Sequence, residues 1–378
     1  MKFTIQRDRL VESLQDVMKA VSSRTTIPIL TGVKLLVTEE GVTLTGSDSD
    51  ISIETIIPKV EDEQIIVEIE RTGSIVLQAR FFNDIIRKLP EDTVMIEVKD
   101  NLQTFIKSGN AEFSINGLDA EEYPRLPQIE EEEVYKLPTD LLKAIIRQTV
   151  FAVSTSETRP ILTGVHWRIE NNELTCVATD SHRLAWRKAP LESELNHSHS
   201  VVIPGKSLNE LNKILDDSQD PIEMVLTQNQ ILFKTKNLLF FSRLLEGNYP
   251  DTSRLIPNES KTDVILNAKE FLQAIDRASL LAREGRNNVV KFSIIGNDSI
   301  EISSDSPEIG RVVEIVKTQS IIGEELKISF SGKYLMDALK AIDSTEIKIS
   351  FTGAMRPFVI RSIDNDFILQ LILPVRTF

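Results

Sequence analysis

The chain has 378 residues, of which 41% are hydrophobic, and its net charge is −14 at pH 7. This length can supply three cores at about 100–200 residues per domain, whereas the negative charge argues against an ordinary nucleic-acid-binding domain, which carries a basic surplus. A single cysteine, Cys176, excludes an intramolecular disulfide and any multi-cysteine metal site.

The first ten residues, MKFTIQRDRL, carry charges where a secretory signal needs an apolar segment. No stretch of the chain reaches the 18 or more apolar residues of a membrane span. We therefore expect a soluble protein of the cytoplasm that has no membrane partner.

The first predicted helix lies within residues 7–24. Its residues Leu10, Leu14, Val17 and Val21 follow one another at i, i+4, i+7 and i+11. This spacing places them on one side of a helix with charged residues opposite. The pattern predicts an amphipathic helix packed against a core.

The heptapeptide that follows, TIPILTG at 26–32, recurs as TRPILTG at 158–164, which is 132 positions later. Each copy precedes an apolar strand, an acidic turn, a second strand and then an aspartate at the same offset, Asp48 or Asp180. A third, more divergent copy, VVKFSIIGNDSIEISSDS, lacks the heptapeptide but reaches Asp305. The chain therefore contains an internal repeat.

The prolines of the heptapeptide, Pro28 and Pro160, have a fixed φ angle. We expect each to form a turn where the chain leaves a helix, with the following Ile-Leu beginning a strand.

Each copy continues with a strand, a short helix and two further strands. The alternation of Val94, Ile96 and Val98 predicts strands with one buried face, and Tyr-Pro pairs close the first two copies. Acidic residues 130–133 are the best linker candidate, and residues 250–263 are the second. The predicted fold is α+β, with domains at 1–125, 126–253 and 254–378 that each bury a core and meet edge to edge.

Charge is unevenly distributed along the chain. The six predicted helical segments hold 18 Lys and Arg against 14 Asp and Glu, a net of +4, so the remainder carries −18. One hypothesis is that the helices share a mildly basic surface while the strands form an acidic one. The alternative is that helices hold more charges of both signs. The segments are 7–24, 80–88, 139–159, 206–217, 267–286 and 333–343.

The stretch ATDSHRLAW at 178–186 contains Asp180, Ser181 and His182, the three residue types of a hydrolase triad. Neighbouring residues on a strand point to opposite faces, whereas a triad needs groups that converge from separate segments. Cys176 lies among alternating apolar residues, which is typical of a buried small hydrophobe. These residues therefore predict no nucleophilic site.

Two further motifs resemble binding sites only superficially. His197 and His199 form a loop pair without a carboxylate at a useful spacing for a metal. Gly205-Lys206-Ser207 matches the end of a phosphate-binding loop, but the upstream glycine is missing, because position 200 is serine. We expect no metal, no cofactor and no catalytic residues.

The full chain closely resembles the bacterial sliding clamp family, the beta subunit of the DNA polymerase III holoenzyme. The motifs that carry the resemblance are TIPILTG near residue 30, ATDSHRLA near 180, EGNYPD near 250 and the terminal LPVRTF. It implies three clamp domains, each of two helices backed by antiparallel sheets. Two chains would close head to tail into a six-domain ring that encircles duplex DNA and confers processivity on the polymerase without chemistry of its own.

The resemblance also implies that cations on or beside the channel helices contact DNA phosphates without reading sequence, with Arg24 and Arg159 the favoured pair. For the others the alternative is an ordinary solvated helix charge. The candidates are Arg7, Lys19, Arg24, Lys143, Arg147, Arg159, Lys206, Lys213, Arg277 and Lys340.

A second implied site is a cleft between the second and third domains that binds a short peptide of the polymerase III alpha subunit, the clamp loader or repair proteins. Arg183 and Arg376 would be its polar handles and Met355 an adaptable wall; for His182 the alternative is core packing. The candidates are Leu162, Thr179, His182, Arg183, Leu184, Pro250, Leu255, Met355, Leu373, Pro374, Val375 and Arg376.

The homodimer contact implied by the resemblance joins Phe113 and Ile115 of one chain to Leu280 and Leu281 of the next, and it would protect an exposed strand edge. The sequence departs from the family at Ser181, where glycine is frequent, and in the extension 377–378, whose aromatic end could narrow the cleft. Two alternative functions are an enzyme with a site around Asp180 and a scaffold that binds peptides but not DNA.

Overall fold

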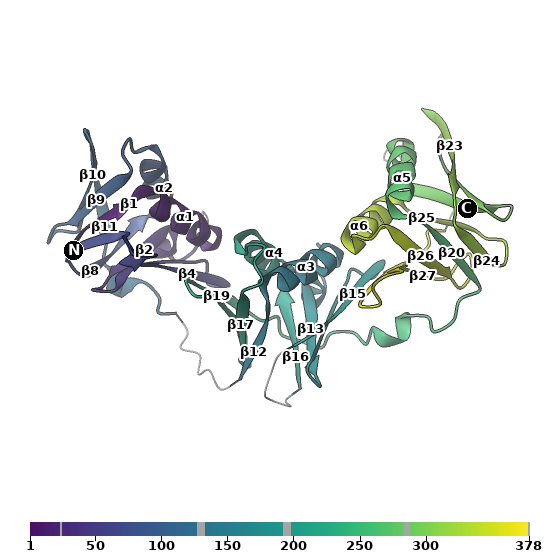
Figure 1. The fold of residues 1–378 in the computed structure, drawn as a ribbon, viewed down its shortest axis with the longest axis horizontal. Helices are drawn as coiled ribbons and strands as arrows, with labels where there is room; N and C mark the ends of the chain where they lie inside the picture. Colours follow the sequence, from purple (N-terminus) through teal and green to yellow (C-terminus); the bar gives the residue numbers. More distant parts are fainter. Residues whose placement is uncertain (23–24, 127–132, 192–197, 283–287, 377–378) are drawn as a thin grey trace. The chain divides into compact units, whose positions relative to one another are not determined.

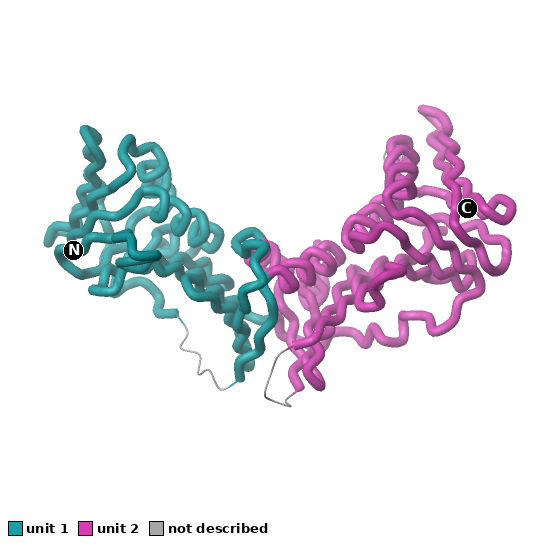
Figure 2. The backbone as a smooth tube through the Cα atoms, viewed as in Figure 1, with its two compact units in different colours: residues 1–139, 213–244 teal, residues 140–212, 245–378 magenta. Residues whose placement is uncertain are grey.

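The computed structural model describes residues 1–22, 25–126, 133–191, 198–282 and 288–376. They form two compact units, one of residues 1–139 with 213–244 and the other of residues 140–212 with 245–378 (Figure 2). Within these described ranges no helix is both long and apolar enough to span a membrane.

The first unit contains one antiparallel sheet whose described strands run in the order β12-β17-β18-β19-β4-β3-β2-β8-β11-β10-β9-β1-β7. Figure 1 labels most of these strands. A separate hairpin joins β5 (Val60–Glu61) and β6 (Gln64–Ile65). The helices of the first unit are α1 (Arg7–Val17) and α2 (Ala79–Lys88). The strands of the large sheet are β1 (Lys2–Gln6), β2 (Gly32–Val37), β3 (Gly41–Ser47), β4 (Ile51–Pro58), β7 (Val67–Arg71), β8 (Gly73–Gln78), β9 (Thr93–Val98), β10 (Gln103–Ser108), β11 (Ala111–Leu118), β12 (Val134–Pro138), β17 (Pro221–Leu226), β18 (Gln230–Lys234) and β19 (Leu238–Arg243).

The second unit contains two antiparallel sheets, with described strand orders β16-β13-β14-β15-β28-β27-β26-β20-β24 and β23-β22-β21-β25. Its helices are α5 (Ala268–Ala282) and α6 (Gly332–Ile342), while α3 (Thr139–Thr149) begins and α4 (Gly205–Ile214) ends at the division between the units. The strands are β13 (Gly164–Glu170), β14 (Glu173–Thr179), β15 (Arg183–Pro190), β16 (His199–Pro204), β20 (Thr262–Asn267), β21 (Val289–Ile295), β22 (Ser299–Ser306), β23 (Gly310–Lys317), β24 (Ser320–Gly323), β25 (Lys327–Ser331), β26 (Glu346–Phe351), β27 (Phe358–Ser362) and β28 (Ile368–Ile372).

The cores follow from the apolar patterns. On α1, Leu10, Leu14 and Val17 are fully buried, as the helical spacing predicts. In the third copy, the rings of Phe292 and Phe351 lie 5.1 Å apart between centroids, within a larger cluster that α5 and α6 cover. Such rings bury large apolar areas, so they dominate the stability of this core.

The helix ends differ from the predictions for 7–24 and 139–159, because α1 and α3 are shorter and each passes into a single 3₁₀ turn, Met18–Ala20 or Val150–Ala152. The expectation that Ile-Leu begins a strand is wrong. Pro28–Thr31 and Pro160–Thr163 each form a second 3₁₀ turn, closed by a threonine hydroxyl that donates to the proline carbonyl oxygen at 2.8 and 2.7 Å. Proline suits the first position of such a turn because no N–H is needed there.

The strand begins instead at the glycine of the heptapeptide. A side chain at Gly164 would meet the Ile203 carbonyl oxygen and a Val202 methyl at 2.7 Å. Since β13 approaches β16 this closely, only glycine fits. The heptapeptide thus recurs because it builds the same turn and the same tight strand entry twice.

The second copy shares sheets with both of its neighbours. Its strand β19 pairs with β4 of the first copy, and its strand β15 pairs with β28 of the third copy. The predicted edge-to-edge joining is therefore present inside each unit. Because its two sheets extend different neighbours, the second copy is divided between the two compact units.

Candidate functional site

The repeated aspartate after β14 forms a turn. Asp180 Oδ1 accepts hydrogen bonds from the backbone N–H groups of His182 (2.9 Å) and Arg183 (3.0 Å). The Thr179 hydroxyl accepts from the Ser181 N–H and donates to the Arg183 carbonyl oxygen, and Ser181 has a φ angle of 76°. The aspartate side chain therefore braces the backbone, as Asx turns do.

The first copy contains the same turn. Asp48 Oδ1 accepts from the N–H groups of Asp50 and Ile51 at 3.0 and 2.8 Å, and Ser49 has a φ angle of 80°. The two copies differ at one informative position, because Ile51 occupies the place of Arg183. The turn is thus a shared structural device, whereas the arginine is specific to the second copy.

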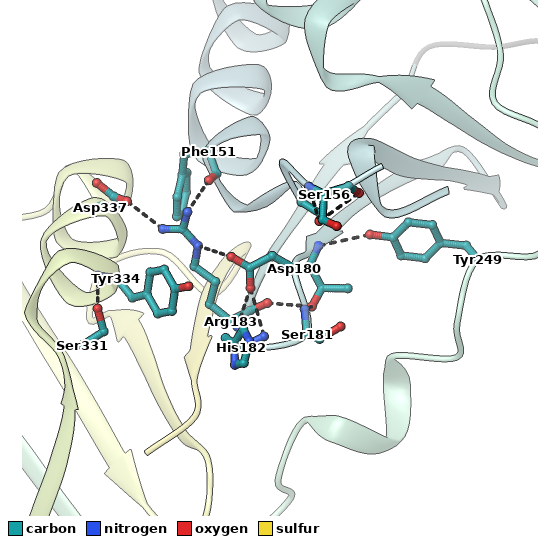
Figure 3. A network of polar contacts seen from close by, with 12 residues as sticks. Phe151, Ser156, Asp180, Ser181, His182, Arg183, Tyr249, Ser331, Tyr334 and Asp337 are labelled. Carbon is teal, nitrogen blue, oxygen red and sulfur yellow. Dashed lines mark hydrogen bonds and ion pairs between the residues drawn. The ribbon is translucent and has the colours of Figure 1, made fainter. Parts of the chain in front are cut away.

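Arg183 joins the second copy to the third through a nearly buried guanidinium (Figure 3). Its Nε lies 3.0 Å from Asp180 Oδ2, its Nη1 lies 2.7 Å from Asp337 Oδ2 on α6, and its Nη2 donates to the Phe151 carbonyl oxygen at 2.7 Å. The ring of Tyr334 is 4.4 Å from the guanidinium carbon. Each guanidinium nitrogen therefore has a partner within the chain, which argues against Arg183 as a polar handle for a ligand.

His182 is exposed beside this network, so the alternative of core packing is wrong. Its ring stacks on Tyr334 at 6.4 Å, and its carbonyl oxygen accepts from the Leu373 N–H at 2.9 Å. His182 thus connects the turn to the C-terminal segment.

The apolar floor beside the turn comes from four neighbouring strands, β14, β15, β28 and β27. Leu184 on β15 and Leu371 on β28 are buried in one cluster with Val177, Val359 and Leu369. Leu162 and Thr179 are also buried, whereas Leu255, Met355 and Leu373 are 49%, 57% and 37% exposed. All twelve predicted peptide-site residues lie in the second unit, with Pro250 and Arg376 exposed and Pro374 and Val375 half-buried.

Tyr249 supports this floor, although the sequence predicted for it only a closing turn. Its hydroxyl accepts from the Thr179 N–H at 3.1 Å, and its ring stacks on His166 at 5.0 Å. Burial raises the pKa of Tyr249, while burial and then Arg168 lower the pKa of His166. The EGNYP motif could have indicated a role for Tyr249 at this site. No sequence signal indicated Tyr334 or Asp337, because they lie on a helix far in sequence from Arg183.

The predicted DNA contacts fall into two groups. Arg147 and Lys340 are exposed and line one cavity of about 240 Å³ in the second unit, together with Asp337 and Asp343. Arg159, Lys206 and Lys213 are also exposed, and Lys143 is half-buried on α3.

Arg7, Lys19 and Arg277 bind groups of the protein itself. Arg7 donates to the Leu89 carbonyl oxygen, and Lys19 pairs with Asp16 at 2.8 Å. Arg277 makes two hydrogen bonds of 2.6 Å to Glu314 on β23. A bidentate pair leaves little of the guanidinium for phosphate, which argues against Arg277 as a DNA contact. Arg24 lies outside the described residues, as do 377–378 and most of the linker 130–133.

The predicted dimer residues lie at two exposed strand edges. Phe113 and Ile115 are on the edge strand β11, whereas Leu280 and Leu281 are on α5, which packs beside the edge strand β23. In the first unit, β11 bonds to β8 only at Gly117 and Leu118, so its earlier residues have β10 alone beside them. Phe113 on this stretch is 40% exposed, and Ile115 is half-buried.

In the second unit, β23 is the last described strand of its sheet and exposes Ile315 at 66%. Leu280 on α5 is 58% exposed, and Leu281 is half-buried. The sequence did not single out β23.

No catalytic arrangement is formed by the described residues. Asp180 binds the backbone of His182 and not its ring. Burial raises the pKa of Cys176, which disfavours a thiolate. The described part of the chain contains no group of His, Cys, Asp and Glu side chains that could hold a metal ion.

Repeated helix-and-sheet domains that share sheet edges and carry an apolar floor define a protein that acts by binding. Family models for the DNA polymerase III beta subunit match its N-terminal domain at residues 1–127, its central domain at 136–251 and its C-terminal domain at 253–376. The chain belongs to this family, the beta sliding clamps, which are non-catalytic processivity factors of DNA polymerase III. The predicted family and three-domain α+β fold are confirmed, and the enzyme alternative is wrong.

The similarity extends over complete chains. The Beta sliding clamp of Bacillus subtilis is 67% identical over 378 residues, and that of Halalkalibacterium halodurans is 57% identical over 381, with 100% of each chain covered. The crystal structure of the Bacillus subtilis clamp superposes with a TM-score of 0.98, and the beta chain from Streptococcus pneumoniae, 42% identical, with 0.94, again over 100% of both chains.

Proposed function

We propose that two copies of this chain close head to tail into a ring around duplex DNA. The observation that carries the proposal is the pair of apolar edges, β11 in the first copy and β23 in the third. Successive copies within the chain already join through strand edges, and joining β11 to β23 of another chain would continue the same rule. A contact between two different surfaces closes into a ring when its rotation is suitable.

In this ring the domains are residues 1–125, 126–253 and 254–378. The DNA contacts are those candidates that remain exposed, with Arg147 and Lys340 supported by their shared cavity. Phosphate contacts of this kind are independent of sequence and weaken with salt, so the ring can slide. The site of action is the cytoplasm.

The docking cleft for partners is the apolar floor around Leu184 and Leu371, bordered by the exposed Leu255, Met355 and Leu373. An apolar floor with a few polar groups at its border is typical of a peptide site. The partners are the polymerase III alpha subunit, the clamp loader and repair proteins that carry a clamp-binding peptide. The alternative function is a scaffold that binds peptides but not DNA. The two functions differ in whether the protein encircles DNA.

The test is loading onto nicked circular DNA with the matching clamp loader and ATP, then linearisation and gel filtration. We expect the protein to stay on the circle and to leave once the DNA is cut, because cutting changes topology but not local contacts. Retention after cutting would mean ordinary surface binding. No retention, with a loader active on another clamp, would favour the scaffold.

A further inference from the structure

We propose that the peptide bound in the cleft continues into a basic groove that prefers carboxylates. The groove is a cavity of about 400 Å³ between β21, β25 and the C-terminal segment, and its defining residues are Lys291, Lys327, Ser329, Met355, Val375 and Arg376. This inference rests on the proposed peptide docking, and it specifies the chemistry of the ligand beyond its apolar anchor.

The groove is continuous with the cleft because they share residues. Met355, Val375 and Arg376 are members of the predicted peptide site and also line the groove. The Val375 N–H donates to the Ser329 carbonyl oxygen at 2.7 Å, which fixes the C-terminal segment against β25. A peptide that contacts Met355, Val375 and Arg376 in the proposed cleft therefore also borders the groove.

The strand register places the lysines on the outer face. Lys291 pairs with Ser329, and Ser293 pairs with Lys327, across β21 and β25. The intervening Phe292 and Ile328 are 0% and 4% exposed. Because side chains alternate along a strand, the lysines and serines point outward together and offer cations with hydroxyl groups between them.

The positive charge of the groove is only partly compensated. Asp305 lies 2.5 Å from Lys291 and offsets that charge. Lys327 and Arg376 make no ion pair with any residue that the structure describes, and none of the described lining residues is a carboxylate. On a chain of net charge −14, such a local excess of cations selects an acidic segment by charge complementarity.

The experiment uses the full-length protein and a fluorescent peptide carrying the cleft-binding segment of the polymerase III alpha subunit. The peptide is extended at either end by three aspartates, three serines or three lysines, and fluorescence polarisation gives each Kd. We expect one aspartate extension to bind about three- to tenfold more tightly than the matching serine extension, since exposed ion pairs contribute modestly. The gain should shrink between about 50 and 300 mM salt.

Two variants locate the effect. Lys327→Ser should abolish most of the gain from the aspartates. Lys261→Ser removes the same charge at an exposed position that does not line the groove, and it should keep the gain.

Equal affinity of all extensions would contradict the proposed preference of the groove for carboxylates. An equal gain in affinity from the aspartates in the Lys327→Ser protein would contradict it as well. Either result would leave the proposed peptide docking intact. If the unextended peptide does not bind, the docking proposal fails and this inference fails with it. Displacement of the aspartate-extended peptide by an equal concentration of short oligothymidylate would assign the groove to nucleic acid instead.

Discussion

Arg183 shows how one side chain fixes the turn of the candidate site. Its guanidinium lies between Asp180 and Asp337, and all three side chains are at least two-thirds buried. Removing one member of a buried ionic group leaves the others uncompensated. The wall of the proposed cleft therefore depends on a residue whose own polar atoms are bound by the protein.

We expect Arg183→Ala to lower the free energy of unfolding by about 2–4 kcal/mol, since two carboxylates lose their partner. Denaturant unfolding followed by tryptophan fluorescence measures the change. The control is Arg168→Ala, whose exposed pair with Glu170 is 3.7 Å long, and it should cost no more than about 0.5 kcal/mol. Equal losses for both variants would contradict the bracing role.

Ser181 and Ser49 occupy equivalent turns with φ angles of 76° and 80°. A side chain in this region costs about 1–2 kcal/mol, which exceeds the entropic cost of glycine. We expect Ser181→Gly and Ser49→Gly each to stabilise the protein by roughly 0.5–1 kcal/mol in the same unfolding assay.

The control for this pair is Ser74→Gly on β8, where φ is not positive, and it should destabilise slightly. Destabilisation by both turn variants would show that the serines contribute more than their conformation suggests.

At the scale of elements, stacked rings join β13 to the segment after β19. The His166 ring lies against Tyr249, its Nε2 is 2.8 Å from the Ser200 hydroxyl, and the charge of Arg168 acts on it. Burial, followed by Arg168, lowers the pKa of His166 below the ordinary 6.5. The folded protein therefore resists protonation at this ring.

The sign of the pH effect follows from this shift. Below about pH 6.5 the unfolded histidine gains a proton before the folded one, so stability falls as pH decreases toward the folded pKa. We expect the melting temperature of the wild type to fall more than that of His166→Gln between about pH 7.5 and 5.5. Parallel curves for the two proteins would exclude His166 as the titrating group.

The sequence was most informative where structure is local. The repeated aspartates, the strand-turn-strand units and the apolar stripe of α1 depend on residues a few positions apart, and the pattern found them. Helix lengths were overestimated because the 3₁₀ turns after Val17 and Thr149 carry residues that also suit a helix. The partners of Arg183 were missed because Asp337 lies 154 positions away, and no local pattern encodes such a distance.

At the scale of the whole molecule, the proposed ring closes through the two exposed edges, β11 and β23. We expect Phe113→Asp on β11 and Ile315→Asp on β23 each to convert a dimer to a monomer, because either change would bury an unpaired charge in the interface. Gel filtration with light scattering measures the mass.

The matched control for these variants is Ile65→Asp on the β5–β6 hairpin, a position that is 60% exposed and outside both edges. It should remain dimeric. Dimers in both edge variants would place the interface elsewhere.

The division of the second copy between two sheets also limits how this copy could be removed or replaced. Its strands β19 and β15 are each completed by a neighbouring copy, so a fragment holding this copy alone would present two open ladders of unpaired backbone groups. A different middle copy could therefore replace this one only if it matched both of these strand pairings. The three copies share one sequence of helices and strands, but the middle copy depends on both neighbours to complete its sheets.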